Sequence, residues 1–395
     1  MRDKKNILWM GAISWLFEDG TYFPRVSYPG IVSGSLFQQS MIEGMESKGY
    51  NIQILNDCDM SEGERVDWSH NGKNCDVRVG GKKGLFKRLF SKTINLKKEF
   101  KKNKYYLDKE VLIVYEIHLP YLLNVLYLKK KNKNIKVILI CPDLSMYSDL
   151  SLKKKKIKSF LKKIELFFIN NLLKYIDGFV IFTKSMLDYL GKYCKPYQVI
   201  EGVYANKFEL DDTICEKYKY ILYSGSLHHN TGIEELIESF IKLNLKDIKL
   251  VFFGSGSLSE YIIKMSEMYD SIVYKGFVEP KALFVYEQKS LCLLNLRNPS
   301  EEYTKYSFPS KLFEFMASGT PVITTNLAGI PDEYKQYMIV IENNSFDNIK
   351  SAVEKVLNFS TAERRRFGLN AREFVLSKKN KYVQSCKLEK LIEEI

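Results

Sequence analysis

The chain has 395 residues, of which 45% are hydrophobic and 13% aromatic, and its formal net charge is +13. This length suits two domains of ordinary size, and the apolar content excludes a disordered chain. The positive charge belongs to residues 1–200, which hold 35 Lys and Arg against 20 Asp and Glu, whereas residues 201–395 hold 25 against 27.

The first half alternates apolar strands with helices, as in sheets that crossover helices bury on both faces. Strands are predicted at 6–11, 51–55, 111–117, 136–141, 178–182 and 197–202, with helices at 33–50, at 120–131 and along the basic run 152–173.

The alternation restarts after the polar segment 206–219, which predicts an α/β chain of two doubly wound, Rossmann-like domains. We place the first domain at 1–205, the second at 206–379, and at 380–395 a C-terminal helix that packs back on the first domain. Strands of the second half are predicted at 220–227, 249–257, 271–278, 291–296, 321–325 and 338–342, with helices at 231–244, at 281–289, before Gly319, and twice at the C-terminus.

The cysteines and the apolar runs indicate the compartment. The seven cysteines form no C-x-x-C pair, and their odd number argues against a disulfide framework or a zinc site and for a reducing cytoplasm. The N-terminal apolar stretch is too short for a signal peptide, and no run approaches the roughly 20 apolar residues of a membrane span. We therefore expect a cytoplasmic protein.

Two basic segments, 82–104 and 152–173, interleave Lys with Phe, Leu and Ile at helical spacing. Such segments can lie on an anionic membrane surface. They can also be the solvated faces of ordinary core helices. We favour membrane contact over nucleic acid, because no nucleic-acid motif accompanies the charge.

Glycine turns after strands are the first candidates for a ligand site, because such sheets bind ligands at the carboxyl ends of their strands. Gly225-Ser226-Leu227 follows one strand and precedes a helix, so that its amides can hold a phosphate. Gly254 follows the next strand, and Gly34 precedes the first long helix. Each glycine can equally serve a tight turn alone.

The stretch KYSFPSKLFEFMASGTPVI (305–323) is the second candidate. Ser307 or Ser310 can cap a helix that ends at Gly319 in a left-handed conformation. Architecture does not account for Lys311 and Glu314, a cation and an anion in one short helix. Together they suit a ligand with phosphates and hydroxyls.

These motifs make the second half resemble the nucleotide-sugar-binding domain of glycosyltransferase family 4, the retaining enzymes of GT-B fold. The stretches that carry the resemblance are YSGSLHHNTGIEELIESF, LVFFGSGS, YKGFV and KYSFPSKLFEFMASGTPVI. The first half adds a Lys-Gly-Tyr turn at 48–50 and a His after the strand VLIVYEI. The form YSFPSKLFEFMASGTP is most similar to bacterial enzymes of capsule, exopolysaccharide or O-antigen synthesis.

The resemblance implies roles for three residues. Glu314 would accept hydrogen bonds from the ribose hydroxyls of the donor, since a carboxylate offers two oxygens to a vicinal diol. His118 would contact the donor sugar, and Lys311 would neutralise the diphosphate leaving group. The alternatives are a surface glutamate, a strand-end histidine and an exposed helix lysine. The implied donor site comprises Gly225, Ser226, Leu227, Gly254, Phe277, Arg297, Tyr306, Ser307, Phe308, Ser310, Lys311 and Glu314.

Three positions depart from the family pattern. The first of the two family glutamates falls at Tyr306, so the donor sugar can differ. The usual phosphate-binding arginine and lysine fall at Ser226 and Thr231. Three alternatives follow: Lys311, Arg297 and the amides of the Gly225 turn hold the diphosphate, or donor binding is weak, or the protein is a non-catalytic relative.

Three further candidates stay open. Asp57-Cys58-Asp59 has the spacing of a metal-binding pair found in the other large glycosyltransferase fold, but the resemblance implies a fold that needs no metal, and we expect no cofactor. His228-His229 lies beside the predicted phosphate. Asp143 ends a strand where it can orient an acceptor, and Gly34 would place a helix N-terminus on the same, acceptor side.

The function that we expect is transfer of a sugar from a nucleotide diphosphate donor, here taken as UDP-linked, to a lipid-linked oligosaccharide in bacterial surface polysaccharide synthesis. The resemblance implies retention at the anomeric carbon and a cleft between the domains. The protein would be cytoplasmic and peripheral on the inner face of the plasma membrane. The alternative is a non-catalytic partner that binds or anchors another transferase.

Overall fold

The computed structural model describes residues 5–16, 22–23, 30–57, 68–70, 73–75, 85–144, 156–193, 196–205, 208–210 and 218–395. The chain divides into two compact units. Unit 1 comprises Met1–Ala205 with Lys381–Ile395, and unit 2 comprises Asn206–Asn380.

The described part of unit 1 is built on a six-stranded parallel sheet in the order β10-β9-β8-β7-β1-β4. Its strands are almost wholly buried, as expected for a parallel sheet that helices cover on both faces. The strands are β1 (Asn6–Gly11), β4 (Asn51–Asn56), β7 (Val111–Tyr115), β8 (Lys136–Cys141), β9 (Gly178–Ile181) and β10 (Tyr197–Val199). Two short antiparallel pairs lie outside this sheet, β2 (Trp15–Leu16) with β3 (Tyr22–Phe23) and β5 (Trp68–His70) with β6 (Lys73–Cys75).

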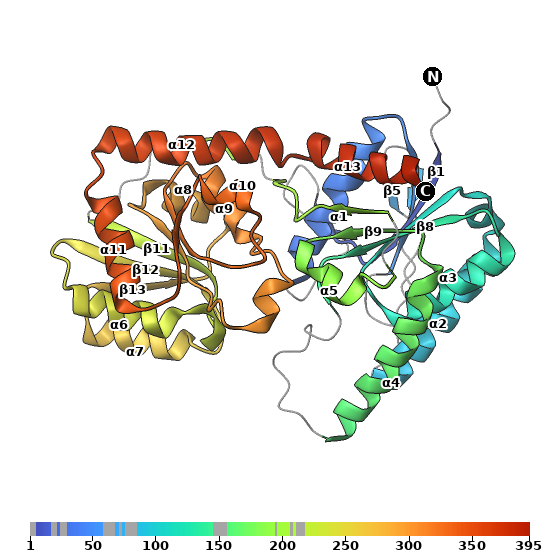
Figure 1. The fold of residues 1–395 in the computed structure, drawn as a ribbon, viewed down its shortest axis with the longest axis horizontal. Helices are drawn as coiled ribbons and strands as arrows, with labels where there is room; N and C mark the ends of the chain where they lie inside the picture. The colour runs from blue at the N-terminus through green and yellow to red at the C-terminus, as the bar shows by residue number, and fades with distance from the viewer. Residues whose placement is uncertain are drawn as a thin grey trace. The chain divides into compact units, whose positions relative to one another are not determined.

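Helices cover the two faces of this sheet in separate groups (Figure 1). On one face α1 (Gly30–Glu46) packs against α13 (Lys381–Glu394), where a Cβ on Gly44 would lie 2.5 Å from the carbonyl oxygen of Lys381. On the other face α3 (Leu119–Lys131) contacts α2 (Leu85–Lys102) and α4 (Lys156–Leu172). The shorter helices are η1 (Lys104–Asp108), η2 (Leu173–Tyr175), η3 (Lys184–Met186) and α5 (Leu187–Leu190).

Unit 2 repeats the design with a parallel sheet in the order β13-β12-β11-β14-β15-β16. The order changes direction between β11 and β14, and such a switch point opens a crevice outside the carboxyl ends of the strands. The strands are β11 (Lys219–Ser226), β12 (Ile248–Ser255), β13 (Ile272–Gly276), β14 (Leu293–Asn295), β15 (Val322–Thr325) and β16 (Ile339–Ile341).

Figure 1 shows α6 and α7 below this sheet and α8, α9 and α12 above it. The helix α12 approaches the end of α9 closely, since a Cβ on Gly368 would lie 1.8 Å from the carbonyl oxygen of Gly319. The helices are η4 (His229–Thr231), α6 (Ile233–Leu243), α7 (Ser259–Met268), α8 (Pro280–Lys289), η5 (Glu302–Lys305), α9 (Lys311–Ala317), α10 (Asp332–Lys335), α11 (Phe346–Leu357) and α12 (Thr361–Lys378).

The predicted fold class is confirmed, with two parallel-sheet α/β units, but some boundaries are wrong. The helix α7 was not predicted, and three helices, α11 to α13, follow β16 where two were predicted. Helix α1 begins at Gly30, so Gly34 does not precede it. Instead Gly34 allows the helix to lie against β7, because a Cβ there would stand 2.9 Å from the Tyr115 hydroxyl oxygen. Within the described residues, no helix combines the length and apolar character needed to cross a bilayer.

Candidate functional site

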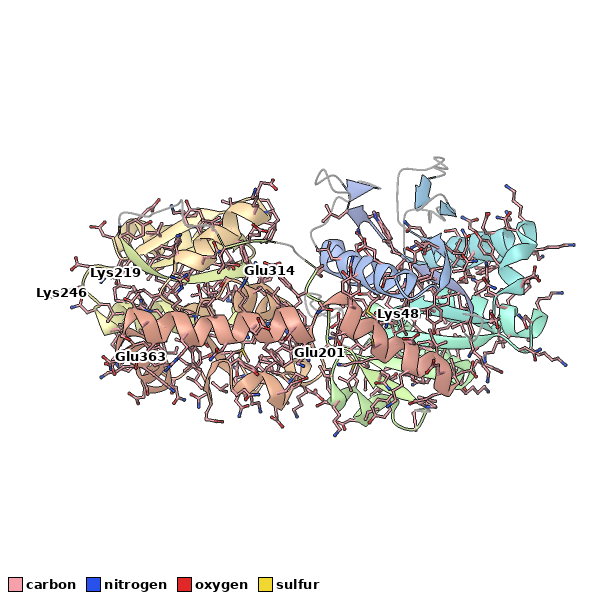
Figure 2. The ribbon with its side chains drawn as sticks, turned by 90° about the horizontal axis from the view of Figure 1, so that it is seen from above. Lys48, Glu201, Lys219, Lys246, Glu314 and Glu363 are labelled. Atoms are coloured by element: carbon pink, nitrogen blue, oxygen red, sulfur yellow. The ribbon has the colours of Figure 1, made fainter. Side chains whose placement is uncertain are left out.

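The carboxyl edge of the unit 2 sheet gathers most of the predicted donor residues. The turn after β11 carries Gly225, Arg297 follows β14, and α9 carries Lys311 and Glu314. Figure 2 shows Glu314 at the end of unit 2 opposite to Lys219, which begins β11. These residues therefore lie at the switch point, the edge where doubly wound sheets bind ligands.

The two glycine turns of β11 and β12 lie in register, with Gly225 opposite Gly254. Both have positive φ, +141° and +123°. A Cβ on Gly254 would lie 1.9 Å from the carbonyl oxygen of Gly225, so only glycine fits there. A Cβ on Gly225 would meet no described atom within 4 Å, so the space beside this turn is open.

The amide of Leu227 is not available to a phosphate. It donates to the carbonyl of Ser255 at 3.1 Å, and the Leu227 side chain is fully buried in the core. The prediction that this amide holds a ligand is therefore wrong for the structure as it stands. Beside it, Nδ1 of His228 lies 3.2 Å from the Ser257 amide, so His228 joins the two turns. Ser226 itself is exposed at the end of β11.

Arg297 lies near the position where the family pattern has a lysine. Its charge lowers the pKa of Tyr223 and of Tyr303, although burial raises both values overall. Next to Thr231, the position of the absent lysine, a Cβ on Gly232 would lie 1.9 Å from the carbonyl oxygen of Leu296, the residue before Arg297. Arg297 therefore brings a positive charge close to Thr231, and no ion pair within the described part of the chain engages it.

The stretch before α9 has mainly a structural role. Phe308 is buried and packs against Phe313 and Tyr334, with ring centroids 5.0 and 5.2 Å apart. The side chain of Ser310 makes no capping hydrogen bond, so that prediction is wrong. Ser307 also fails to cap α9, because its hydroxyl donates back to the carbonyl of Tyr303 at 3.3 Å.

The end of α9 has the predicted backbone conformation, and two aromatic residues of the predicted donor site differ in exposure. Gly319 follows α9 with φ +75°, the left-handed conformation that was predicted. Tyr306 is half-buried at the end of η5. Phe277, just after β13, is 73% exposed, so it is the one of these predicted donor residues with a large apolar side chain open to a ligand.

Lys311 bridges two carboxylates. Its Nζ lies 3.0 Å from Oε1 of Glu287 and also donates to Oε2 of Glu314. Glu287 comes from α8 and is fully buried, whereas the side chains of Lys311 and Glu314 are 25% and 32% exposed. The Ser224 hydroxyl donates to the same Oε1 of Glu287 at 2.8 Å.

The charges of this network perturb one another. Burial opposes the charge of Lys311, but the two carboxylates outweigh it and raise the pKa of its ammonium. Burial, with the charge of Glu314, raises the pKa of Glu287, while Lys311 and Ser224 act in the opposite direction. Lys311 is therefore charged at neutral pH and is held from both sides.

Sequence reasoning missed Glu287. The only available signal was its spacing: it lies three residues after the apolar Phe284 in α8, so it shares the buried face of that helix. A charged residue on such a face requires a partner. The partner was one of the residues already singled out, Lys311.

Unit 1 holds the remaining predicted residues. His118 is half-buried at the start of α3, and its ring makes an edge contact with that of Tyr121 at 5.1 Å. Asp143 is exposed after β8. The pKa of the Glu116 carboxyl is raised, mainly by desolvation. The charge of Asp143 also raises this pKa, and the charge of Lys92 lowers it in part. Glu116, with φ +77°, and Asp143 thus follow neighbouring strands at one edge.

Asp57 does not behave as part of a metal pair. Its carboxylate forms a buried ion pair with Lys92 at 2.9 Å. Cys58 and Asp59 lie outside the described residues. Among the residues that the structure describes, no group of three His, Cys, Asp or Glu side chains is arranged to hold a metal ion. Lys92, which belongs to the basic segment 82–104, is therefore buried in this ion pair.

Several solved structures share this architecture. Sucrose-phosphate synthase from Thermosynechococcus elongatus matches with a TM-score of 0.70 and 14% identity over 99% of each chain. A trehalose-6-phosphate protein from E. coli bound with UDP-2-fluoro glucose matches at 0.65 and 11%, over 98% of this chain and 99% of that one. The lipopolysaccharide outer core galactosyltransferase WaaB matches at 0.61 and 14%, over 98% and 99%. At these identities the likeness establishes the fold.

Residues 208–374 match the family model described as glycosyl transferases group 1. No curated protein matches the sequence. The matched domain and the two-domain architecture define the class: the chain is a glycosyltransferase with the GT-B fold.

Proposed function

We propose that the protein transfers a sugar, with retention, from a UDP-linked donor to a lipid-linked oligosaccharide in bacterial surface polysaccharide synthesis. The observation that carries the donor part is the presence of Glu314 and Lys311 on α9, at the carboxyl edge of the unit 2 sheet. A carboxylate there can accept hydrogen bonds from two ribose hydroxyls.

The diphosphate would bind over the turn after β11. The open space beside Gly225 suits a phosphate, and Arg297 supplies a cation close to Thr231. A fixed positive charge at this point would stabilise the charge that develops on the leaving group. Arg297 thus compensates for Ser226 and Thr231, where the family pattern has cations. No metal is required by this scheme.

A uridine nucleotide is supported by one of the similar structures, which contains UDP-2-fluoro glucose. The exposed ring of Phe277, after β13, could pack against the base, as aromatic side chains do in nucleotide sites. In unit 1, His118 would contact the donor sugar, and Asp143 would mark the acceptor side. WaaB, another similar structure, is a lipopolysaccharide outer core galactosyltransferase, which supports a saccharide acceptor on a lipid.

Exposed aromatic rings on α2 and α4 support a membrane surface as the place of action. Phe90 on α2 is 71% exposed, and Phe167 and Phe168 on α4 are 64% and 48% exposed. Both helices are basic and both pack against α3 (Figure 1). Rings that enter the headgroup region, beside lysines that pair with anionic lipids, are typical of peripheral membrane proteins. The protein would thus lie on the cytoplasmic face of the membrane.

Calorimetric titration with UDP and with GDP, in the presence of EDTA, tests the donor site. We expect UDP to bind the wild type and to bind Glu314→Ala about tenfold more weakly or worse, since hydrogen bonds to a charged group contribute roughly 1.5–3 kcal/mol. The matched control is Glu354→Ala, a half-exposed glutamate on α11 away from the site. If neither nucleotide binds the wild type, the donor site is wrong and the non-catalytic partner becomes the better interpretation.

A further inference from the structure

The carboxylate of Glu287 has a place in unit 2 that packing alone does not explain. Its side chain is fully buried, and Oε1 accepts hydrogen bonds from both Lys311 and Ser224. The second oxygen, Oε2, is buried and accepts no hydrogen bond from any described residue. An ionised group in this position is costly to bury, and a well-packed apolar residue would stabilise the fold as well or better.

The backbone around Glu287 is held as firmly as its side chain. The carbonyl of Glu287 accepts from the Thr320 hydroxyl at 2.8 Å and from the Ser290 hydroxyl at 2.9 Å. Both hydroxyls are buried. The end of α8 is therefore tied to the turn after α9, so that the carboxylate of Glu287 is presented to Lys311 from a rigid support.

The network then reaches the surface in two steps. Glu287 holds one side of the Lys311 ammonium, and Glu314, one turn further along α9, accepts from the other side. The two carboxylates together offset the single positive charge of Lys311. In this state the lysine serves to orient Glu314 rather than to attract a phosphate, and its own position depends on Glu287.

We propose that Glu287 is a positioning residue of the donor site, which acts through Lys311 to orient Glu314 toward the ribose hydroxyls of a nucleoside diphosphate sugar. This inference rests on the proposed function, because it takes Glu314 as the ribose ligand. Lys311 is likewise assigned the role of orienting Glu314. A carboxylate that must accept two hydrogen bonds from a diol benefits from being held before the ligand arrives.

A comparison of two ligands separates this role from a purely structural one. UDP and its 2′,3′-dideoxy analogue differ only in the ribose hydroxyls. We expect Glu287→Gln, which keeps the shape and loses the charge, to bind UDP about tenfold more weakly than the wild type, the order of one hydrogen bond to a charged group. The dideoxy analogue should bind the variant and the wild type alike. In a Glu314→Ala background the effect of Glu287→Gln on UDP should disappear.

Two further variants complete the experiment. Glu333→Gln is the matched control, because it neutralises the partner of another buried lysine of unit 2, Lys379, at 2.7 Å, and it should leave both affinities unchanged. Glu287→Asp keeps the charge but shortens the reach, and it should show the same selectivity for UDP if Glu287→Gln does not fold.

Different results would overturn the positioning role of Glu287 and the donor site itself. Equal weakening of both ligands, or an undiminished effect in the Glu314→Ala background, would overturn the positioning role while UDP binding by the wild type upholds the donor site. Failure of the wild type to bind UDP would overturn the donor site and the positioning role together.

Discussion

The ammonium of Lys311 on α9 lies 3.0 Å from Oε1 of Glu287 on α8, a carboxylate with no exposed surface. The same ammonium also donates to Glu314, three residues along its own helix. Two neighbouring helices are thus joined by a charge network that begins in the core and ends at the surface where the donor is proposed to bind.

Removal of the cation from this network should be costly. We expect Lys311→Met to lower the free energy of unfolding by about 3 kcal/mol, because it leaves the buried carboxylate of Glu287 without its partner. The double variant Lys311→Met/Glu287→Met should recover most of this stability, since an apolar pair carries no desolvation cost. Urea denaturation measures both. A double variant no more stable than the single one would show that the ion pair is not what links the helices.

The pH dependence of stability should report Glu287 directly. Burial raises its pKa above the ordinary value of 4.5, so the folded chain holds this proton more tightly than the unfolded chain. Its contribution to stability is complete below pH 4.5 and is lost as the pH rises through the higher folded-state value. The raised pKa of Lys311 keeps that residue protonated across this window.

The variant Glu287→Gln lacks the titrating group, so its stability should improve relative to the wild type as the pH rises from 4.5. Denaturation curves at pH 4.5 and at several higher values provide the comparison. Ser224→Ala keeps the carboxyl group, removes a hydrogen bond that lowers its pKa, and should keep the sign of the wild-type slope. A stability difference between Glu287→Gln and the wild type that does not change with pH would contradict the assignment.

Arg297 should matter for the phosphates and not for the nucleoside. We expect Arg297→Gln to weaken UDP binding by about tenfold, and UMP binding by less, because a fixed cation acts most strongly on the more highly charged ligand. Added salt should reduce the difference. The control is Arg365→Gln on α12, an exposed arginine outside the site. Equal loss for UMP and UDP would place Arg297 in the fold rather than at the diphosphate.

Membrane association should depend on the exposed rings of α4. We expect Phe167→Ser/Phe168→Ser to sediment less with vesicles that contain anionic lipid, because both rings are largely exposed beside lysines such as Lys163. The matched control is Met268→Ser on α7, where an apolar side chain of unit 2 is 61% exposed. Wild-type protein that stays in the supernatant with anionic vesicles would refute the membrane surface altogether.

Sequence patterns predicted the strands of both sheets well. The predicted strand over 136–141 coincides with β8, because a continuous apolar run bounded by polar residues has one favourable solution in a parallel sheet. Helix starts were harder. Gly34 was interpreted as a turn before the first long helix, but the helix begins four residues earlier. The glycine is required by close packing on Tyr115, a contact that the local sequence does not reveal.

The features of the candidate site also fall into two groups, those that follow from local sequence and those that depend on distant residues. The turn at Gly225 and the end of α9 at Gly319 follow from residues close in sequence. The ion pair of Lys311 with Glu314 also lies within one helical turn, although the sequence predicted only a shared role toward a ligand. Such features depend on local backbone geometry, which a short stretch of sequence determines. The hydrogen bond from the Leu227 amide to Ser255 and the buried pair Asp57–Lys92 depend on neighbours distant in the chain, and neither was predicted.

The sequence by itself thus determined the two doubly wound units and the edge proposed to bind the ligand, because continuous apolar runs and turn residues are local features of the chain. Only the tertiary structure decided what surrounds Lys311. The packing of α8 beside α9 brings Glu287 within 3.0 Å of its ammonium, and Ser224 on β11 completes the contact. Burial makes that contact strong, and burial is a property of the assembled fold.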